Sequence, residues 1–433
     1  MIGFDAMRSF LLWTFGFSAV LTQAGTAEAA TVYRNVHTTG DLMSVFSEAD
    51  ANPSNYYYTT VYGGIYTPSS TLQLNKGRLK LVGPDLASPG SAIIDGQGTR
   101  RVISLSPPSG FSPYLEAWGI TISNGSTESS GGGLQVLGGT VLLNSCDVSS
   151  NASTLPGAGI AVQSAALYLF LSTVRENVGH NLTAGGGQNS IGGGIALGAD
   201  SYAQIEQSSV VDNKNIRGAG IAATGNAQLY LTNSTLGGNR ASAKGGGLLV
   251  SETATVVMQF NTVSNNTAGD QSGIGEPAYG GGLAISNYTG AFTLVGTILA
   301  GNTTRITNGI GTSRGDNCFE DLVYPSSFTA SLHGNIIGGL ENCVQLGSVM
   351  WPNMGTTDAL LGLYPIANNA SSNAYVVPTF MPKSTSVAIQ AYSRYWWVGG
   401  TSTLPCPSSD ARGYARTSTS LCDIGAVDYT SHH

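Results

Sequence analysis

The sequence predicts a single right-handed parallel β-helix, an all-β solenoid with a helical N-terminal cap and an irregular, disulfide-containing C-terminal cap. Three observations predict this fold. Glycine-rich triplets recur at near-constant spacing, an aliphatic-x-x-Asn pattern follows each triplet, and apolar residues alternate with polar ones between the two. The chain has 59 glycines and 10 % charged residues, but 41 % of its residues are hydrophobic, which excludes a disordered chain.

The triplets read Gly-Gly-Gly or Gly-Ala-Gly, precede an aliphatic residue, and begin 26, 35, 26, 27 and 35 residues apart. Their first residues are Gly131, Gly157, Gly192, Gly218, Gly245 and Gly280. Glycine permits positive φ and a close approach between coils where a Cβ would clash. We therefore expect the triplets to lie in the turns of a solenoid. A phosphate-binding loop is excluded because no helix-forming sequence follows the triplets.

An asparagine follows the first glycine of each triplet by 20 to 22 residues, after an aliphatic residue and two variable ones. These asparagines are Asn151, Asn177, Asn213, Asn239, Asn266 and Asn302. The alternation between triplet and asparagine, as in residues 227–236, is typical of a strand with one buried face. Such strands bury their apolar faces by stacking coil on coil, and stacked Asn amides can hydrogen-bond along the ladder.

The N-terminal residues 1–29 have the features of a signal peptide. Arg8 precedes an apolar run from Phe10 to Leu21, and Ala27-Glu28-Ala29 offers small residues for cleavage before Ala30. No later segment has the length and apolar character of a transmembrane helix, so we expect none in the mature chain.

The rest of the chain divides into two caps and the coils between them. Residues 30–56 are expected to form an N-terminal cap with a short helix, behind an N-cap at Thr39 or Asp41. The apolar face of that helix would comprise Leu42, Val45, Phe46 and Ala49. Residues 57–304 would form the β-helix coils, and residues 305–433 the final coils and the C-terminal cap.

Five cysteines fit an exported protein. Cys318 and Cys343 flank one loop-rich segment, Cys406 and Cys422 flank another, and both pairs are expected to close disulfides in an oxidising compartment. Cys146 lies within a repeat and is interpreted as a small buried hydrophobic residue. No Cys/His spacing indicates a metal site, and no cofactor is expected.

The repeats over roughly residues 119–302 resemble those of secreted bacterial right-handed β-helix proteins with polymorphic-outer-membrane-type repeats, although Val or Leu replaces the frequent Phe. The ending Asp410-Ala411-Arg412-Gly413-Tyr414 … Cys422-Asp423-Ile424-Gly425-Ala426-Val427-Asp428 is similar to the closing motif of choice-of-anchor Q domain proteins, with Asp428 in place of Glu. This resemblance implies a secreted or surface-displayed β-helix. Because five residues follow Asp428, we expect free secretion or residence in the periplasm to compete with surface display.

The charges of the middle region concentrate in the turns between the asparagine and the next triplet. They are Arg175, Glu176, His180, Asp212, Lys214, Arg217, Arg240 and Lys244, followed by Asp270 and Glu276. With coils in register, the first eight are expected to form a stripe along one edge. The insertions 179–191 and 267–279 would wall a shallow groove beside it.

Two functions remain open at this stage. The first is an adhesion or glycan-binding scaffold without catalysis, since Tyr56-Tyr57-Tyr58 and Tyr395-Trp396-Trp397 can either stack on sugar rings or cover a cap. The alternative is a polysaccharide lyase or glycoside hydrolase. A lyase would neutralise a uronate with Arg217 and Arg240 and use Lys214, Lys244 or His180 as base, whereas a hydrolase would pair Asp212 with Glu176.

The expected partner is an extracellular polysaccharide or a cell-surface glycan, bound by a monomer. A net charge of −7 without basic runs excludes a nucleic-acid surface.

Overall fold

The computed structural model describes residues 30–86, 89–179, 190–269 and 277–305, and shorter stretches between 313 and 429. The signal peptide predicted for residues 1–29, His180, Cys343, Cys406 and the Tyr395-Trp396-Trp397 run lie outside the described residues. The described chain forms the predicted right-handed parallel β-helix, in which four sheets stack coil on coil. No helix in the described residues is long and apolar enough to cross a bilayer.

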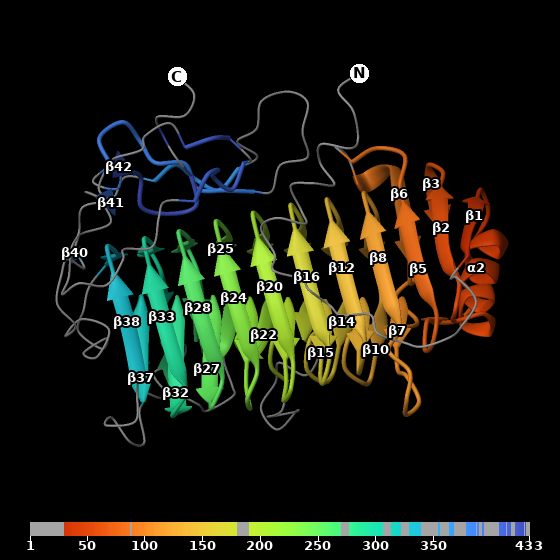
Figure 1. The fold of residues 1–433 in the computed structure, drawn as a ribbon. Helices are drawn as coiled ribbons and strands as arrows, with labels where there is room; N and C mark the ends of the chain where they lie inside the picture. Colours follow the sequence, from red (N-terminus) through yellow and green to blue (C-terminus); the bar gives the residue numbers. More distant parts are fainter. Residues whose placement is uncertain are drawn as a thin grey trace. The chain divides into compact units, whose positions relative to one another are not determined.

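Sheet A is an 11-stranded parallel sheet that runs the length of the coils (Figure 1). Its strands, in spatial order, are β1 (Thr31–Val36), β2 (Tyr56–Val61), β5 (Arg78–Val82), β8 (Tyr114–Trp118), β12 (Thr140–Asn144), β16 (Ala166–Phe170), β20 (Tyr202–Glu206), β24 (Gln228–Thr232), β28 (Thr255–Gln259), β33 (Ala291–Val295) and β38 (Thr329–His333). Alternate residues of these strands point into the core or outward, as in the alternation of buried and half-buried residues in β16.

Sheet B follows sheet A in each coil and is also 11-stranded. It comprises β3 (Gly64–Tyr66), β6 (Ala92–Asp95), β9 (Thr121–Ser123), β13 (Asp147–Ser149), β17 (Thr173–Arg175), β21 (Ser209–Val211), β25 (Thr235–Gly237), β29 (Thr262–Ser264), β34 (Ile298–Leu299), β39 (Ile336–Ile337) and β40 (Met354–Gly355).

Sheets D and C complete the coil. Sheet D comprises β10 (Ser126–Thr127), β14 (Ala152–Ser153), β18 (Val178–Gly179), β22 (Lys214–Arg217), β26 (Arg240–Lys244), β30 (Thr267–Ala268) and β35 (Thr303–Thr304); in addition, β31 (Ala278–Tyr279) pairs with β26, and β36 (Ser313–Arg314) pairs with β31. Sheet C comprises β4 (Leu72–Gln73), β7 (Ile103–Leu105), β11 (Leu134–Val136), β15 (Ile160–Val162), β19 (Ile195–Leu197), β23 (Ile221–Ala223), β27 (Leu248–Glu252), β32 (Leu283–Tyr288) and β37 (Cys318–Asp321). Middle coils therefore have four strands, one in each of the four sheets.

A short 3-10 helix, η1 (Pro89–Ser91), precedes β6, and β41 (Tyr392–Ser393) pairs with β42 (Leu421–Cys422) antiparallel. Cys146 is buried, as expected, and the pKa of its thiol is raised by burial to about 12. Cys318 is disulfide-bonded. Its pairing with Cys343 stays a prediction, as does the pairing of Cys406 with Cys422.

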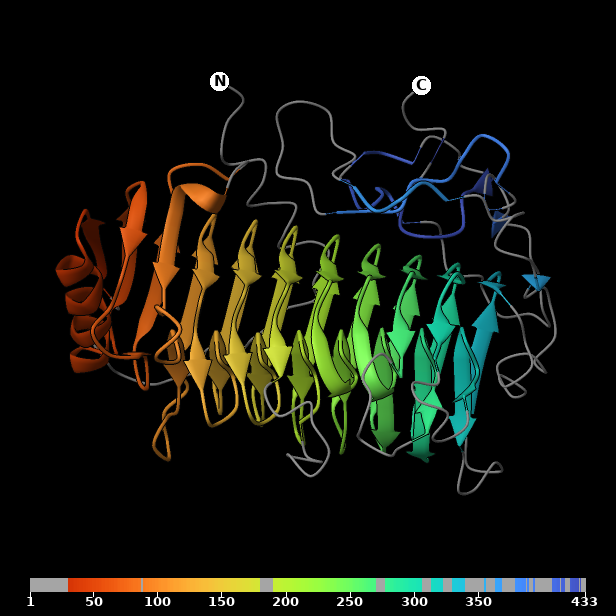
Figure 2. The same ribbon diagram turned by 180° about the vertical axis from the view of Figure 1, so that it is seen from behind.

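Helix α2 (Thr39–Ala51) lies beside the first coils (Figure 2) and buries the predicted face of Leu42, Val45, Phe46 and Ala49. Its N-cap is Thr38, not Thr39 or Asp41. The Thr38 hydroxyl accepts a hydrogen bond from the Asp41 N–H, and the Asp41 carboxylate accepts one from the Thr38 N–H, which completes a capping box. Strand β1 precedes the helix and pairs with β2, so sheet A begins within the segment expected to be only a cap.

The triplets form the corner between sheets D and C, and their first glycines all have positive φ. The third glycine of each triplet leaves room for a side chain of the asparagine ladder. A Cβ on Gly194 would stand 2.9 Å from Nδ2 of Asn213, the ladder residue of the next coil. Asn213 in turn donates through Nδ2 to Asn239 Oδ1 at 3.0 Å. The glycine triplet and the asparagine of the repeat are therefore in contact. Because Gly194 has no Cβ, there is room for the Asn213 amide.

The Asn ladder runs from Asn151 through Asn177, Asn213, Asn239, Asn266 and Asn302 to Asn317. A second ladder, not predicted, lies at the corner between sheets A and B. There the N–H of Ser172 donates to Ser208 Oγ, and that of Ser208 to Ser234 Oγ, at 3.1 and 3.2 Å. Both ladders satisfy backbone groups that the turns leave without strand partners.

Candidate functional site

The predicted stripe begins at the corner between sheets B and D. Glu176 and Asp212 occupy equivalent positions in successive coils, each with φ of 56°. Arg175 is held in ion pairs with Asp147 at 2.8 Å and Glu176 at 3.0 Å. Burial raises the pKa of Asp147 despite the opposing effect of Arg175. Arg175 is therefore engaged within the protein.

Asp212 is the acidic residue at this corner whose pKa is raised. Burial and the charge of Glu176 raise the pKa of its carboxyl, against the opposing influence of Arg240, Arg175 and Lys214. Although the residue is exposed overall, its Oδ1 lies so close to Gly238 that a Cβ there would collide with it. Loss of water on that side accounts for the effect of burial.

The predicted cations fall in two ladders of sheet D and not in one line. Lys214 lies beside Arg240 at the start of β22 and β26, and Arg217 lies beside Lys244 at their ends. Like charges directly opposite one another in a sheet repel. The Lys244 ammonium lies 5.4 Å from the Tyr279 ring centroid. Most of the two insertions (180–189 and 270–276) lies outside the described residues, so the predicted groove stays a prediction.

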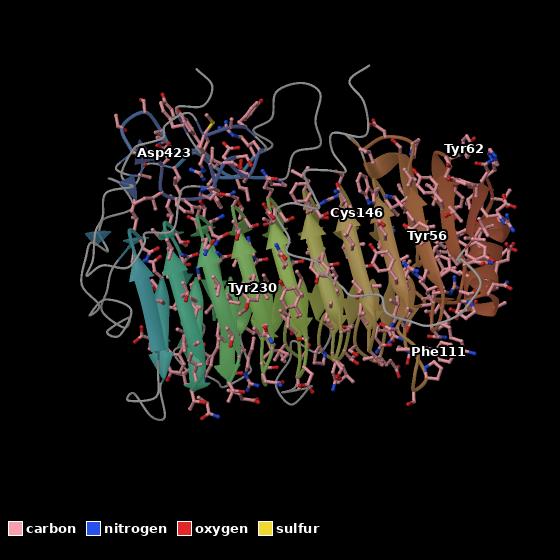
Figure 3. All side chains as sticks on the ribbon, in the orientation of Figure 1. Tyr56, Tyr62, Phe111, Cys146, Tyr230 and Asp423 are labelled. Atoms are coloured by element: carbon pink, nitrogen blue, oxygen red, sulfur yellow. The ribbon has the colours of Figure 1, made fainter. Side chains whose placement is uncertain are left out.

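A second set of side chains, largely missed by the sequence analysis, lies on the outer face of sheet A. Tyr56 and Tyr58 point outward, whereas Tyr57 between them is buried in the core. Other strands of the sheet add rings on the same side (Figure 3 labels Tyr56 and Tyr230). We call the following side chains the aromatic face: Tyr33, Tyr56, Tyr58, Tyr114, Trp118, Tyr168, Phe170, Tyr202 and Tyr230.

In the middle of the aromatic face, three tyrosines of successive coils form a continuous row. The ring centroids of Tyr168 and Tyr202 are 5.6 Å apart, and those of Tyr202 and Tyr230 are 5.4 Å apart. All three rings are half-buried, so each still presents surface to solvent. Burial raises the pKa of Tyr168 and Tyr202, which keeps their hydroxyls protonated.

Towards helix α2, the aromatic face is organised around one carboxylate. Glu116 accepts hydrogen bonds from Lys80 Nζ at 2.7 Å, Trp118 Nε1 at 2.6 Å, Tyr56 Oη at 3.0 Å and Tyr114 Oη at 3.3 Å. We call these five residues the Glu116 cluster. Burial, and then the charge of Glu116, raise the pKa of Tyr56 and Tyr114, so both hydroxyls remain donors. The Lys80 ammonium also lies 4.1 Å from a Trp118 ring centroid.

The closing motif has a structural role on a different sheet. Asp410 forms a buried ion pair with Arg412 at 2.6 Å, and the Ala411 N–H donates to the Ala426 carbonyl, which joins the two parts of the motif. The motif packs against the outer side of sheet B, where Arg416 Nη2 donates to Asn233 Oδ1 and the Asn233 amide donates to the Ser409 carbonyl.

The residues that receive the motif share one corner position between sheets A and B. Gln207, Asn233 and Phe260 occupy it in successive coils, each with positive φ. Gln207 donates to the Asp410 carbonyl, and Arg416 lies over the Phe260 ring at 5.2 Å. The C-terminal cap is thus in part a lateral clamp on sheet B.

Among the described residues, no group of three or more His, Cys, Asp or Glu side chains gathers as a metal site. No family model matches the chain, and no curated protein matches it. Two solved structures are distantly similar. Pectate lyase Pel9A is 12 % identical, covering 93 % of this chain and 97 % of that one with a TM-score of 0.39. ORF18 of Geobacillus virus E2 is 12 % identical, covering 78 % and 57 % with a TM-score of 0.22. Likenesses this distant carry no conclusion about activity.

Proposed function

We propose that this protein is an exported, non-catalytic β-helix scaffold that binds polysaccharide on the aromatic face of sheet A. The observation that supports this is the unbroken row formed by Tyr168, Tyr202 and Tyr230, which come from three successive coils. The C–H faces of pyranose rings pack against aromatic rings, and tyrosine and tryptophan offer large contact areas at low cost in conformational entropy.

The Glu116 cluster extends this surface with side chains that are already fixed. A ring held by a hydrogen bond and a neighbouring cation loses little freedom when a ligand stacks on it, which favours binding. The Trp118 indole is such a ring, since it donates to Glu116 and faces Lys80. The aromatic face therefore combines a preorganised section near helix α2 with the open tyrosine row.

A panel of soluble polysaccharides, tested by affinity electrophoresis with residues 30–433, examines this proposal. The triple variant Tyr168→Ala/Tyr202→Ala/Tyr230→Ala should retain the fold, because all three side chains point outward. It should bind roughly 100-fold more weakly, from about 1 kcal/mol for each ring. The matched control Tyr62→Ala/Tyr364→Ala removes two exposed tyrosines outside sheet A and should bind normally. Equal binding by the triple variant would refute the proposed surface.

A second candidate, glycoside hydrolysis, is favoured by the raised pKa of Asp212 next to Glu176. Acid–base hydrolysis uses two carboxyls, and a raised pKa suits the one that donates the proton. Reducing-end assays on the same panel, together with ultraviolet absorbance for the unsaturated product of a lyase, test it. If the protein releases products and the Asp212→Asn variant does not, catalysis takes place at this corner. That result would contradict the proposal of a non-catalytic scaffold.

A further inference from the structure

The register of sheet A sets the direction in which a ligand meets the tyrosine row. Tyr168, Gln204 and Tyr230 are directly paired on β16, β20 and β24, and Tyr202 lies in the neighbouring column of β20. Its ring fills the space between the two others. Adjacent strands are about 4.8 Å apart, so the row offers one ring for each step of that length along the helix axis.

This repeat matches an extended glycan that lies along the axis. A pyranose chain in that orientation advances by close to one sugar ring per coil and meets a tyrosine at each step. A chain that ran parallel to the strands would meet one ring and then leave the row. The row therefore favours a ligand with an extended backbone of several sugars.

The charge of the surrounding surface identifies the class of sugar. The outward residues of the five strands from β12 to β28 include no basic side chain, and Glu206 is the one acidic side chain among them. The others are Thr140, Leu142, Asn144, Ala166, Tyr168, Phe170, Tyr202, Gln204, Gln228, Tyr230, Thr232, Thr255, Val257 and Gln259. A polymer with a carboxylate or sulfate on each sugar would find no cation here, whereas amides both donate to and accept from sugar hydroxyls.

We infer that the ligand of the row formed by Tyr168, Tyr202 and Tyr230 is an uncharged polysaccharide with an extended backbone, lying along the helix axis. This inference rests on the proposed function and names its substrate class. It also separates this surface from the cations of sheet D, which were the residues that the sequence analysis assigned to a uronate.

Isothermal titration calorimetry with neutral β-linked glucan, xylan and mannan oligosaccharides, and with oligogalacturonides of equal length, tests the inference. Affinity for at least one neutral series should rise steeply from di- to tetrasaccharide. It should change less than about twofold between low and high salt, because no ion pair is screened. Tighter binding of the oligogalacturonides, weakened by salt, would overturn the inference.

A matched pair of variants gives a second, independent measure. Gln204→Lys and Gln204→Glu place opposite charges at the centre of the row on side chains of similar length. For an uncharged ligand, the two dissociation constants should differ by less than about threefold. For an anionic ligand, the lysine variant would bind more tightly than the glutamate variant by about tenfold or more, which would contradict the inference. If no oligosaccharide or polymer binds, the proposed function itself fails, and this outcome differs from both results above.

Discussion

Lys80 Nζ lies 2.7 Å from Glu116 Oε1 on the outer face of sheet A, with both side chains less than one sixth exposed. The same carboxylate also accepts hydrogen bonds from Trp118 and from two tyrosines. Replacing Glu116 with Ala would leave a largely buried ammonium unpaired and three donors unsatisfied. We expect the free energy of unfolding to fall by about 3 kcal/mol, measured by urea denaturation.

The double variant Lys80→Met/Glu116→Gln serves as the control for this prediction. It removes both charges together while keeping side chains of similar size, so it should recover at least half of the stability lost in Glu116→Ala. A double variant as unstable as Glu116→Ala would show that the ion pair is not what organises the cluster.

The Asn ladder predicts that the loss of one of its amides lowers the free energy of unfolding by a large amount. Asn213 accepts hydrogen bonds from the N–H and Nδ2 of Asn177 and donates to Asn239 and to the Val174 carbonyl. Asn213→Ala leaves several buried groups unsatisfied, so we expect a loss of about 3–5 kcal/mol in urea unfolding. Asn226→Ala, in an exposed turn, should cost less than about 1 kcal/mol. Similar losses in both variants would argue against the ladder as a main source of stability.

Glu206 predicts a dependence of stability on pH. Burial raises the pKa of its carboxyl, so the folded state binds this proton more tightly than the unfolded state does. The contribution of Glu206 to stability is therefore present in acid and is lost as the pH rises through the folded pKa. Glu206→Gln should melt at a higher temperature than the parent protein at neutral pH, with the difference vanishing in acid. A lower melting temperature for the variant at neutral pH would mean that the carboxylate is stabilised in the folded protein.

The lateral clamp predicts a local effect of Arg416. Its guanidinium donates to Asn233 at the corner between sheets A and B and to the Asp423 and Gly425 carbonyls of the closing motif, so it joins the motif to the coils. In Arg416→Ala, limited proteolysis followed by mass spectrometry should show early cleavage after about residue 360, with the coils intact. Leu155→Ala, an exposed change away from the clamp, should leave the cleavage pattern unaltered. Identical patterns for Arg416→Ala and the parent protein would exclude the clamp.

The coils and their ladder were predictable because glycine and asparagine recur at fixed distances from one another. Gly194 and Asn213 illustrate why: each is required by a local geometry that every coil repeats. The ladder of Ser172 and Ser208 escaped prediction because serine is abundant throughout the chain. The short strands of sheet D were not predicted, because two-residue strands such as β14 leave no periodicity in the sequence.

The aromatic face was harder to foresee than the charged stripe. Charges are rare in this chain, so Asp212 and Lys214 stand out in the sequence, whereas tyrosines are spread along it. Tyr202 and Tyr230 come together only through strand register, because they occupy neighbouring columns of the sheet. The clamp was equally hidden, since the partner of Arg416 lies almost two hundred residues earlier in the chain.

The most direct test of the central claim is the dissociation constant of the best neutral oligosaccharide for Tyr202→Phe and Tyr202→Ala. Tyr202 contacts both neighbouring rings, and its hydroxyl donates to Gln204. If sugars stack on this row, the phenylalanine variant should bind within about twofold of the parent protein and the alanine variant about tenfold more weakly. Equal affinity of the alanine variant and the parent protein would contradict the account.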